Sequence, residues 1–170
     1  MKKILLIALL LIVGCVPPRL VEKDGLWYAP KTDIPYSGNW TYWYSNGQKQ
    51  VEENYKDGKK VGKWIWYYEN GQKSSEGIYK NKKEVGEWIQ YYENGQKQIE
   101  ATYKDGELDG LWTGWHENEQ IFVEGFFKDG NPDGLHTEWY KNGQKRYERT
   151  FKDGELISEK EWNEDGSVRE

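Results

Sequence analysis

One pattern recurs every 24 residues along this chain of 170 residues, and it restricts the fold more than any other feature. Tryptophan holds one position of the pattern in four repeats, Trp40, Trp64, Trp88 and Trp112, and His136 holds it in repeat five. Three further columns share the period: Glu52, Glu76, Glu100, Glu124 and Glu148; Tyr55, Tyr79, Tyr103, Phe127 and Phe151; and Lys56, Lys80, Lys104, Lys128 and Lys152. A strict period of this length is typical of proteins that stack one small structural unit.

Each repeat carries two turn signals. The first is Asn-Gly, at residues 46–47, 70–71, 94–95 and 142–143, and the second is Asp-Gly, at residues 57–58, 105–106, 129–130 and 153–154. Asn-Gly between aromatic runs favours a two-residue hairpin loop, because a type I′ turn needs positive φ at both central residues. The spacing of the turns leaves strands of roughly seven residues. One repeat is therefore expected to be one β-hairpin.

A two-residue loop fixes which residues face each other across the hairpin. With the loop at residues 70–71, Glu69 lies opposite Gln72 and Trp64 lies opposite Gly77. The same count gives the pairs Trp88–Ala101, Trp112–Gly125, Trp40–Glu53 and His136–Arg149. A large ring thus covers a bare backbone in the middle repeats, while the first and last repeats differ as end units do. A four-residue loop over residues 57–60 then places Tyr55 beside Gly62.

The first fourteen residues form a separate pattern. Lys2 and Lys3 precede the ten apolar residues 4–13, and Gly14 leads into Cys15. This arrangement resembles a bacterial lipoprotein signal peptide, which implies cleavage after Gly14 and acylation of Cys15. Ten apolar residues at ~1.5 Å each span about half of a ~30 Å hydrocarbon core, so a lipid anchor is favoured over a transmembrane helix. We expect the protein at the bacterial cell envelope, in the outer membrane if the cell has one.

The remaining chain divides at the start of the repeats. Residues 15–35 are expected to hold the lipidated cysteine and a tether, with a possible degenerate repeat that begins at Asp24. Residues 36–170 hold the five repeats and a truncated sixth copy that begins at Trp162.

Composition then sets the fold class. Removing residues 1–14 changes the formal charge from −5 to −7 and leaves 24 Leu, Ile, Val and Phe residues, a proportion typical of disordered chains. The 10 Trp and 13 Tyr residues compensate, because each ring can bury about 150–250 Å². Aromatic and turn-forming residues favour strands over helices. We expect an all-β fold: one elongated antiparallel sheet of about eleven strands, twisted or curled.

The same counts exclude several classes. One cysteine and two histidines cannot build a disulfide scaffold or a Cys/His zinc module, and the excess of acidic residues excludes a basic nucleic-acid binder. The sequence contains no nucleophile elbow, phosphate loop or metal motif, and its acidic residues recur at repeated positions rather than as one asymmetric pair. We therefore expect no enzyme, no catalytic residue, no metal site and no cofactor.

The repeat unit resembles a known family. Residues 62–73, with Gly-Lys-Trp at the start and Asn-Gly near the end, and the Tyr-Lys-Asp-Gly at residues 103–106 are similar to MORN-type repeats. More closely, they are similar to the bacterial variant in proteins labelled as antitoxins of the YwqK family. The resemblance implies an extended hairpin sheet that serves as a scaffold or binding surface, without catalytic residues. It departs in repeat four, where Glu119 replaces glycine and His116 replaces tyrosine, and at His136 in repeat five.

Two columns are candidates for binding. The glutamates could bind Ca²⁺ or a cationic partner, but the lysine column four residues later favours an ion-paired or solvated ladder. The rings could stack on sugars or enclose quaternary ammonium, but they are also needed as the core. The two histidines, each at a ring position, are expected to substitute for a ring. The candidate binding residues are Trp40, Trp64, Trp88, Trp112, Tyr68, Tyr92, Glu76, Glu100 and Glu124.

The function that these observations favour is a lipid-anchored repeat scaffold that binds an envelope protein. Two alternatives stay open. Choline- and glucan-binding cell-wall repeats also combine Gly-Lys-Trp, paired aromatics and Asn-Gly, so a carbohydrate- or choline-binding module is one alternative. The antitoxin label implies the other, a protein that neutralises a cytoplasmic toxin.

Overall fold

The computed structural model describes residues 19–169, so the signal segment and Cys15 lie outside the described residues. This part of the chain contains strands and turns without a helix. The strands are β1 (Val21–Lys23), β2 (Leu26–Tyr28), β3 (Gly38–Trp43), β4 (Lys49–Lys56), β5 (Lys59–Lys60), β6 (Gly62–Tyr67), β7 (Lys73–Lys80), β8 (Lys83–Tyr91), β9 (Lys97–Lys104), β10 (Glu107–Trp115), β11 (Ile121–Lys128), β12 (Asn131–Pro132), β13 (Gly134–Trp139), β14 (Lys145–Lys152) and β15 (Glu155–Glu161).

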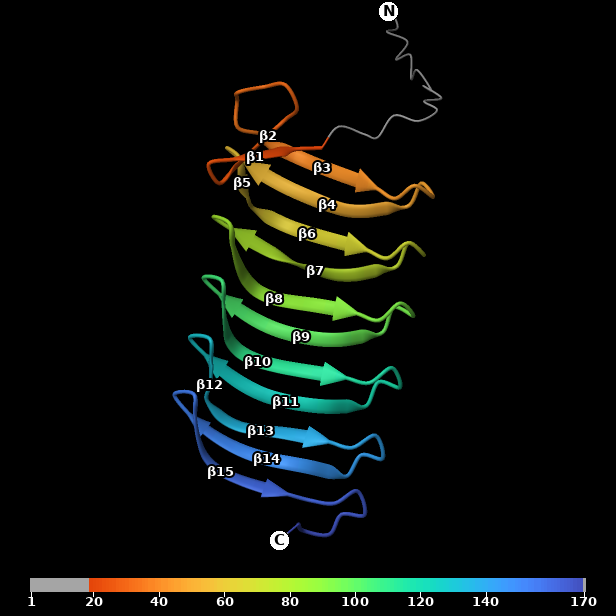
Figure 1. The fold of residues 1–170 in the computed structure, drawn as a ribbon, viewed down its shortest axis with the longest axis vertical. Coiled ribbons are helices and arrows are strands. Elements are labelled where there is room, and N and C mark those ends of the chain that lie inside the picture. Colours follow the sequence, from red (N-terminus) through yellow and green to blue (C-terminus); the bar gives the residue numbers. More distant parts are fainter. Residues whose placement is uncertain (1–18, 170) are drawn as a thin grey trace, which may run out of the picture.

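Thirteen of these strands form one open antiparallel sheet, in which the strands follow one another in sequence order from β3 to β15 (Figure 1). The short strands β5 and β12 pair with β4 and β11 and lie off the main path, which leaves a path of eleven strands. The all-β class, the single elongated sheet and the hairpin repeat predicted from the sequence are confirmed.

The Asn-Gly turns lie at one end of the strands, on the right in Figure 1, and we call this side of the sheet the Asn-Gly edge. Each of these turns has a three-residue loop. In the first of them, the Tyr44 N–H donates to the Gln48 carbonyl and the Gly47 N–H donates to the Tyr44 carbonyl. Gly47 has a φ of 84°, whereas Asn46 keeps a negative φ. This geometry is a type I turn followed by a left-handed glycine. The expected two-residue type I′ loop is therefore wrong at this edge.

A bulge beside each three-residue turn restores the predicted register. In the second hairpin, the Tyr68 N–H donates to the carbonyl of Gln72, so Tyr68 takes the place predicted for Glu69. The register then shifts by one residue between Trp66 and Tyr67. Beyond the shift the predicted pairs are confirmed: Trp64–Gly77, Trp88–Ala101, Trp112–Gly125, Trp40–Glu53 and His136–Arg149.

The Asp-Gly turns line the opposite edge, and they are the type I′ turns. Asp57 has a φ of 49° and Gly58 a φ of 72°. Lys59 and Lys60 pair with the end of β4 directly after the turn, so the expected four-residue loop is wrong. The chain then bulges at Gly62, whose φ is 64°, and the long strand β6 resumes pairing in the predicted register.

Hydrogen bonds join these turns into a series along the sheet. In each, the N–H of the second turn residue donates to a carbonyl of the preceding unit, at 2.8–3.1 Å: Gly58 to Tyr36, Lys82 to Lys60, Gly106 to Glu84, Gly130 to Leu108 and Gly154 to Pro132. Successive hairpins are thus joined outside the sheet ladder as well as within it.

The two ends of the sheet differ. At the N-terminal end, β1 and β2 form a separate hairpin, and the Trp27 N–H donates to the Gly58 carbonyl at 2.9 Å. At the C-terminal end, Asn163, Gly166 and Ser167 repeat the hydrogen bonds of the three-residue turn, as the truncated sixth copy predicts.

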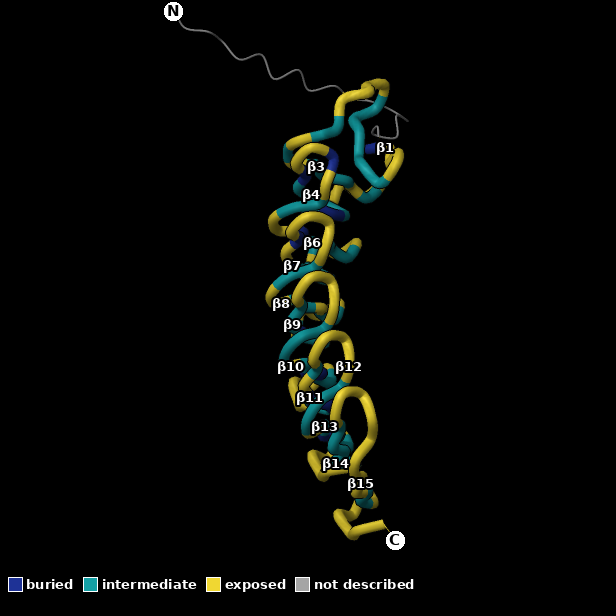
Figure 2. Tube along the Cα trace, turned by 90° about the vertical axis from the view of Figure 1, so that its left-hand side faces the viewer, coloured by how far each residue is buried: buried dark blue, intermediate teal, exposed yellow. Residues whose placement is uncertain are grey.

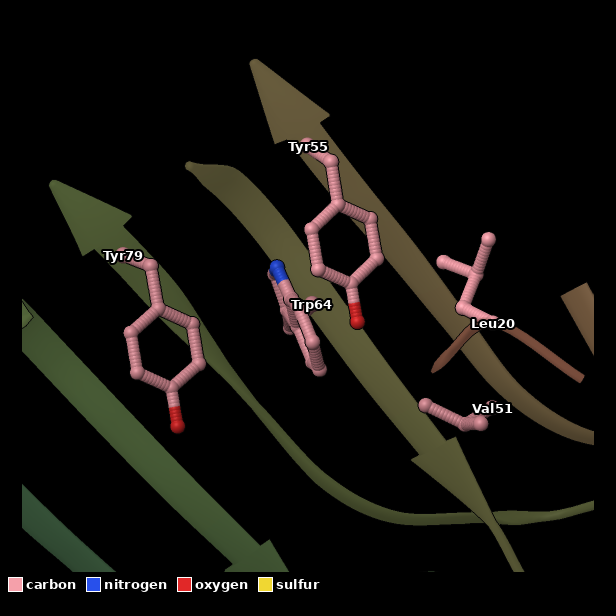
Figure 3. Packing of buried hydrophobic residues seen from close by; sticks show 5 residues of the cluster. All are labelled: Leu20, Val51, Tyr55, Trp64 and Tyr79. Carbon is pink, nitrogen blue, oxygen red and sulfur yellow. The ribbon is translucent and has the colours of Figure 1, made fainter. Parts of the chain in front are cut away.

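The main cluster of buried hydrophobic residues lies near the N-terminal end, where dark blue segments lie around β3, β4 and β6 (Figure 2), and Ala101 and Val123 are buried further along the sheet. Tyr55, Trp64 and Tyr79 lie in a row, and Leu20 and Val51 lie beside them (Figure 3). Trp64 is only 2% exposed. A sheet without a second layer thus builds its core from neighbouring rings on one face.

Candidate binding surface

We call the face of the sheet that carries the tryptophan column the aromatic face. Rings from adjacent strands of the sheet meet edge to face on it: Tyr55 and Trp64 have centroids 5.3 Å apart, Trp64 and Tyr79 5.1 Å, and Tyr79 and Trp88 5.1 Å. The row resumes at Trp112 and continues through Phe127 and His136 to Phe151 in β14.

The four candidate tryptophans therefore contribute to packing. Trp40, Trp88 and Trp112 are half-buried, and Trp64 is buried and offers no surface to a ligand. This placement agrees with the expectation that most rings serve as core.

His136 replaces a tryptophan in this row, as expected. Its ring lies between Phe127 and Phe151, with centroid distances of 5.1 and 5.0 Å. Its Nε2 lies 2.8 Å from the Phe126 carbonyl, ten residues earlier. The Trp64 Nε1–H donates to a carbonyl at the same separation, that of Asn54. His136 thus makes the hydrogen bond of the tryptophan that it replaces, which requires the proton on Nε2.

Tyrosine side chains join neighbouring turns on the Asn-Gly edge. The hydroxyls of Tyr44, Tyr68, Tyr92 and Tyr140 donate to the carbonyls of Tyr67, Tyr91, Trp115 and Trp162, at 2.6–2.9 Å. The candidate residues Tyr68 and Tyr92 therefore hold the next hairpin. Burial, with a smaller effect from Glu93, raises the pKa of Tyr68 above its usual range.

The opposite face, which we call the charged face, carries the glutamate column. Glu76 accepts hydrogen bonds from Lys73 at 2.9 Å, Lys63 at 2.6 Å and the Tyr91 hydroxyl at 2.7 Å. Burial alone would raise the pKa of Glu76, but these three partners together lower it to about 2. Glu76 is therefore a carboxylate held firmly in its charged form.

Three other glutamates have equivalent partners: Lys49 binds Glu52, Lys97 binds Glu100 and Lys145 binds Glu148. The ion-paired ladder expected from the sequence is present, but its lysines precede the glutamates by three residues. The predicted partners of the glutamates are wrong, because the lysines four residues after them do not form the ladder. These lysines are Lys56, Lys80, Lys104, Lys128 and Lys152. The lysines that form the ladder share the same 24-residue period, so the signal was in the sequence.

Glu124 is the exception in this column. The lysine position of repeat four is Ile121, and within residues 19–169 Glu124 forms neither an ion pair nor a side-chain hydrogen bond. Ile121 pairs with Trp115, as Lys97 pairs with Tyr91 one repeat earlier. Trp139 replaces the tyrosine that donates to Glu76, so no hydroxyl is available either. Repeat four thus has a half-buried carboxylate without the ammonium group that the other repeats place beside it.

The turn series also breaks at repeat four. His116 takes the tyrosine position, and its Nε2 is buried with no hydrogen-bond partner in the described part of the chain. Asn94 and Asn118 donate to Gln96 and Gln120 in their own turns, whereas Asn46, Asn70 and Asn142 donate to the next turn. A pocket of about 440 Å³ opens here, lined by Tyr92, His116, Glu117, Asn118 and Lys141.

Within residues 19–169, no three His, Cys, Asp or Glu side chains gather as metal ligands. The same range has no helix with the length and apolarity to cross a membrane.

The fold and its repeating columns define a class of protein, a non-globular array of stacked β-hairpins. A family model described as MORN repeat variant matches the chain five times, at residues 36–57, 60–81, 84–105, 108–129 and 132–153. The chain therefore belongs to the MORN repeat variant family. A comparison with curated proteins found no match. Repeats of this family suggest a scaffold, often one that binds proteins or membranes, and such proteins are generally not catalytic.

Proposed function

We propose that this chain is a lipid-anchored scaffold of the bacterial cell envelope, and that repeat four is its contact site for a protein partner. The observation that carries the proposal is the substitution of Ile121 in the lysine column, which leaves Glu124 without a cation.

The other repeats indicate which chemical group binds beside the glutamate of this column. In them a lysine ammonium lies beside the glutamate, and the Lys97 Nζ also lies 5.8 Å from the centre of the Trp115 ring. In that setting a lysine or arginine side chain is favoured, by ion pairing with the carboxylate and by cation–π attraction to the ring. A partner that supplies this cation would complete the column of charges.

The overall charge of the chain also favours a basic partner. The chain without residues 1–14 carries a formal charge of −7, which favours association with a basic surface and speeds encounter at low salt. An antitoxin-like role would use the same acidic surface against a cytoplasmic partner, and it requires that residues 1–14 do not direct export.

A site-specific crosslink tests the contact. A photo-crosslinking amino acid at Glu117, exposed in repeat four, is expected to capture one protein in the native host, and the same residue at Glu93 in repeat three serves as the matched control. Equal capture of that protein from both positions would contradict a contact at repeat four.

The anchor is tested separately. Growth with a fatty-acid analogue should label the wild-type chain at Cys15 and leave a Cys15→Ala variant unlabelled, because acylation needs the thiol. The variant should leave the membrane fraction. A wild-type chain that takes up no label in a bacterial host would refute the anchor while leaving the contact at repeat four open.

A further inference from the structure

A second site lies at the other end of the molecule, where the N-terminal hairpin meets the first two repeats. A pocket of about 450 Å³ opens there, which is within the range of small-molecule sites. Its lining residues are Arg19, Leu20, Trp27, Tyr42, Gln50, Val51, Glu53 and Trp66, and Leu20 and Val51 are seen in Figure 3. Three rings thus come from three separate strands, β2, β3 and β6.

Glu53 gives this pocket a carboxylate that the repeat pattern does not require. The same position is Gly77, Ala101 and Gly125 in the next three repeats, where a tryptophan or histidine ring packs over small residues. Glu53 accepts a hydrogen bond from the Tyr55 hydroxyl at 2.9 Å. No lysine or arginine of residues 19–169 lies within ion-pair distance of it. Burial raises its pKa, with Tyr55 and Lys60 acting in the opposite direction.

Repeat five also has a charged residue at this position, and there the charge is paired within the chain. Arg149, which aligns with Glu53, has two carboxylate partners, Glu138 at 2.7 Å and Glu159 at 2.5 Å. Glu53 has no such partner, and removing a carboxylate from water without a counter-charge is costly. The charge is therefore available to a ligand cation.

Cations already lie over rings around this pocket. The Arg19 guanidinium carbon is 5.7 Å from the centre of the Tyr42 ring, and the Lys60 Nζ is 4.6 Å from that of Trp64. The Tyr42 hydroxyl oxygen accepts a hydrogen bond from the Leu20 N–H. A primary ammonium has three N–H groups to satisfy, whereas a quaternary ammonium has none and is recognised by rings and a carboxylate.

We propose that the pocket lined by Trp27, Tyr42, Trp66 and Glu53 binds a quaternary ammonium group, either of a free choline-type solute or of a lipid head group. The proposal does not depend on a protein partner at repeat four.

Titration of the full chain with choline chloride, followed by tryptophan fluorescence and calorimetry, tests the pocket. Choline is expected to saturate one site, with ethanolamine at least tenfold weaker because its ammonium needs hydrogen-bond acceptors. Glu53→Gln should weaken choline at least tenfold, whereas Glu52→Gln, a neighbour on the charged face, should leave it unchanged. Trp27→Leu is a second variant, expected to lose binding, and a thermal melt checks that each variant folds.

Cosedimentation with vesicles separates the two sources of the ligand. Binding to phosphatidylcholine vesicles that depends on Glu53, without binding of free choline, would support the pocket and assign the ligand to a lipid. Failure of both probes, or equal binding by wild type and Glu53→Gln, would overturn the proposal. Neither result bears on crosslinking from Glu117.

Discussion

On the aromatic face, the space beneath a ring determines which residue can lie there. The Trp88 ring lies directly over Gly77, and a Cβ built on Gly77 would come within 2.1 Å of the Trp88 Cδ2. Glycine is therefore required here by a close approach of side chain to backbone, and the ring in turn protects the glycine strand.

Gly77→Val should lower the free energy of unfolding by about 1–3 kcal/mol, because the ring must move away from the added side chain. Ser158→Val, an exposed strand position in β15, is the matched control and should change it by less than about 0.5 kcal/mol. Urea denaturation of both variants measures the difference. Equal effects would mean that the ring does not cover Gly77.

Glu76 makes stability depend on acid pH. Its folded-state pKa is about 2, against an unfolded value of about 4.3, so its contribution is present above the unfolded value and is lost as the pH falls through the folded one. Between pH 5 and 2 the wild type should therefore lose more stability than Glu76→Gln does. Melting temperatures across this range measure the effect. Parallel curves for the two proteins would show that Lys63, Lys73 and Tyr91 do not hold the charge.

At the scale of the hairpin, two kinds of turn define the repeat. The Asp-Gly turn needs positive φ at both residues, and the weak copy places Lys82 at a φ of 71°. A left-handed conformation is unfavourable for a residue with a Cβ and easy for glycine.

Lys82→Gly should therefore raise the free energy of unfolding, by up to about 1 kcal/mol. Lys83→Gly, one residue later in β8, is the control and should lower it by about 0.5–1 kcal/mol, as glycine does inside a strand. Chemical denaturation gives both values. Destabilisation by Lys82→Gly would show that the Lys82 side chain stabilises the fold by more than its left-handed backbone conformation costs.

The strand pairs predicted by counting from a two-residue loop are correct, because the bulge beside each three-residue turn shifts the register back by one residue. The turn types could not be predicted from the sequence. The Asn46 Oδ1 accepts a hydrogen bond from the Gln48 N–H at 2.9 Å, which stabilises the three-residue loop over the two-residue loop that Asn-Gly also allows. The register shift that follows leaves Gln50 unpaired between Lys49 and Val51. This bulge turns Lys49 toward Glu52 three residues later, whereas regular alternation places such residues on opposite faces.

At the scale of the whole molecule, the repeats form a one-dimensional series in which each unit contacts its neighbours. The five units followed from the period, the single sheet from the period together with the turn signals and the composition, and the family from the residues that resemble MORN-type repeats. The break at repeat four was visible in the sequence as His116, Glu119 and Ile121, but its meaning depends on which residues the bulges bring together.

Regular columns elsewhere make the irregular repeat informative. The lysine–glutamate pairs and the tyrosine hydroxyls continue on both sides of repeat four and fail within it. A unit that lacks the internal partners of its neighbours is suited to take a partner from outside.

The most direct test restores the missing lysine. In cells that carry the photo-crosslinker at Glu117, Ile121→Lys should reduce capture of the partner at least tenfold, because an internal ammonium then occupies the place beside Glu124. Val123→Ile, a change on the other face of β11, should leave capture unchanged. Capture by the wild type should also fall as ionic strength rises, since exposed charges are screened beyond ~8 Å at physiological salt. Undiminished capture by Ile121→Lys, or capture that is insensitive to salt, would contradict a cation-binding contact at repeat four.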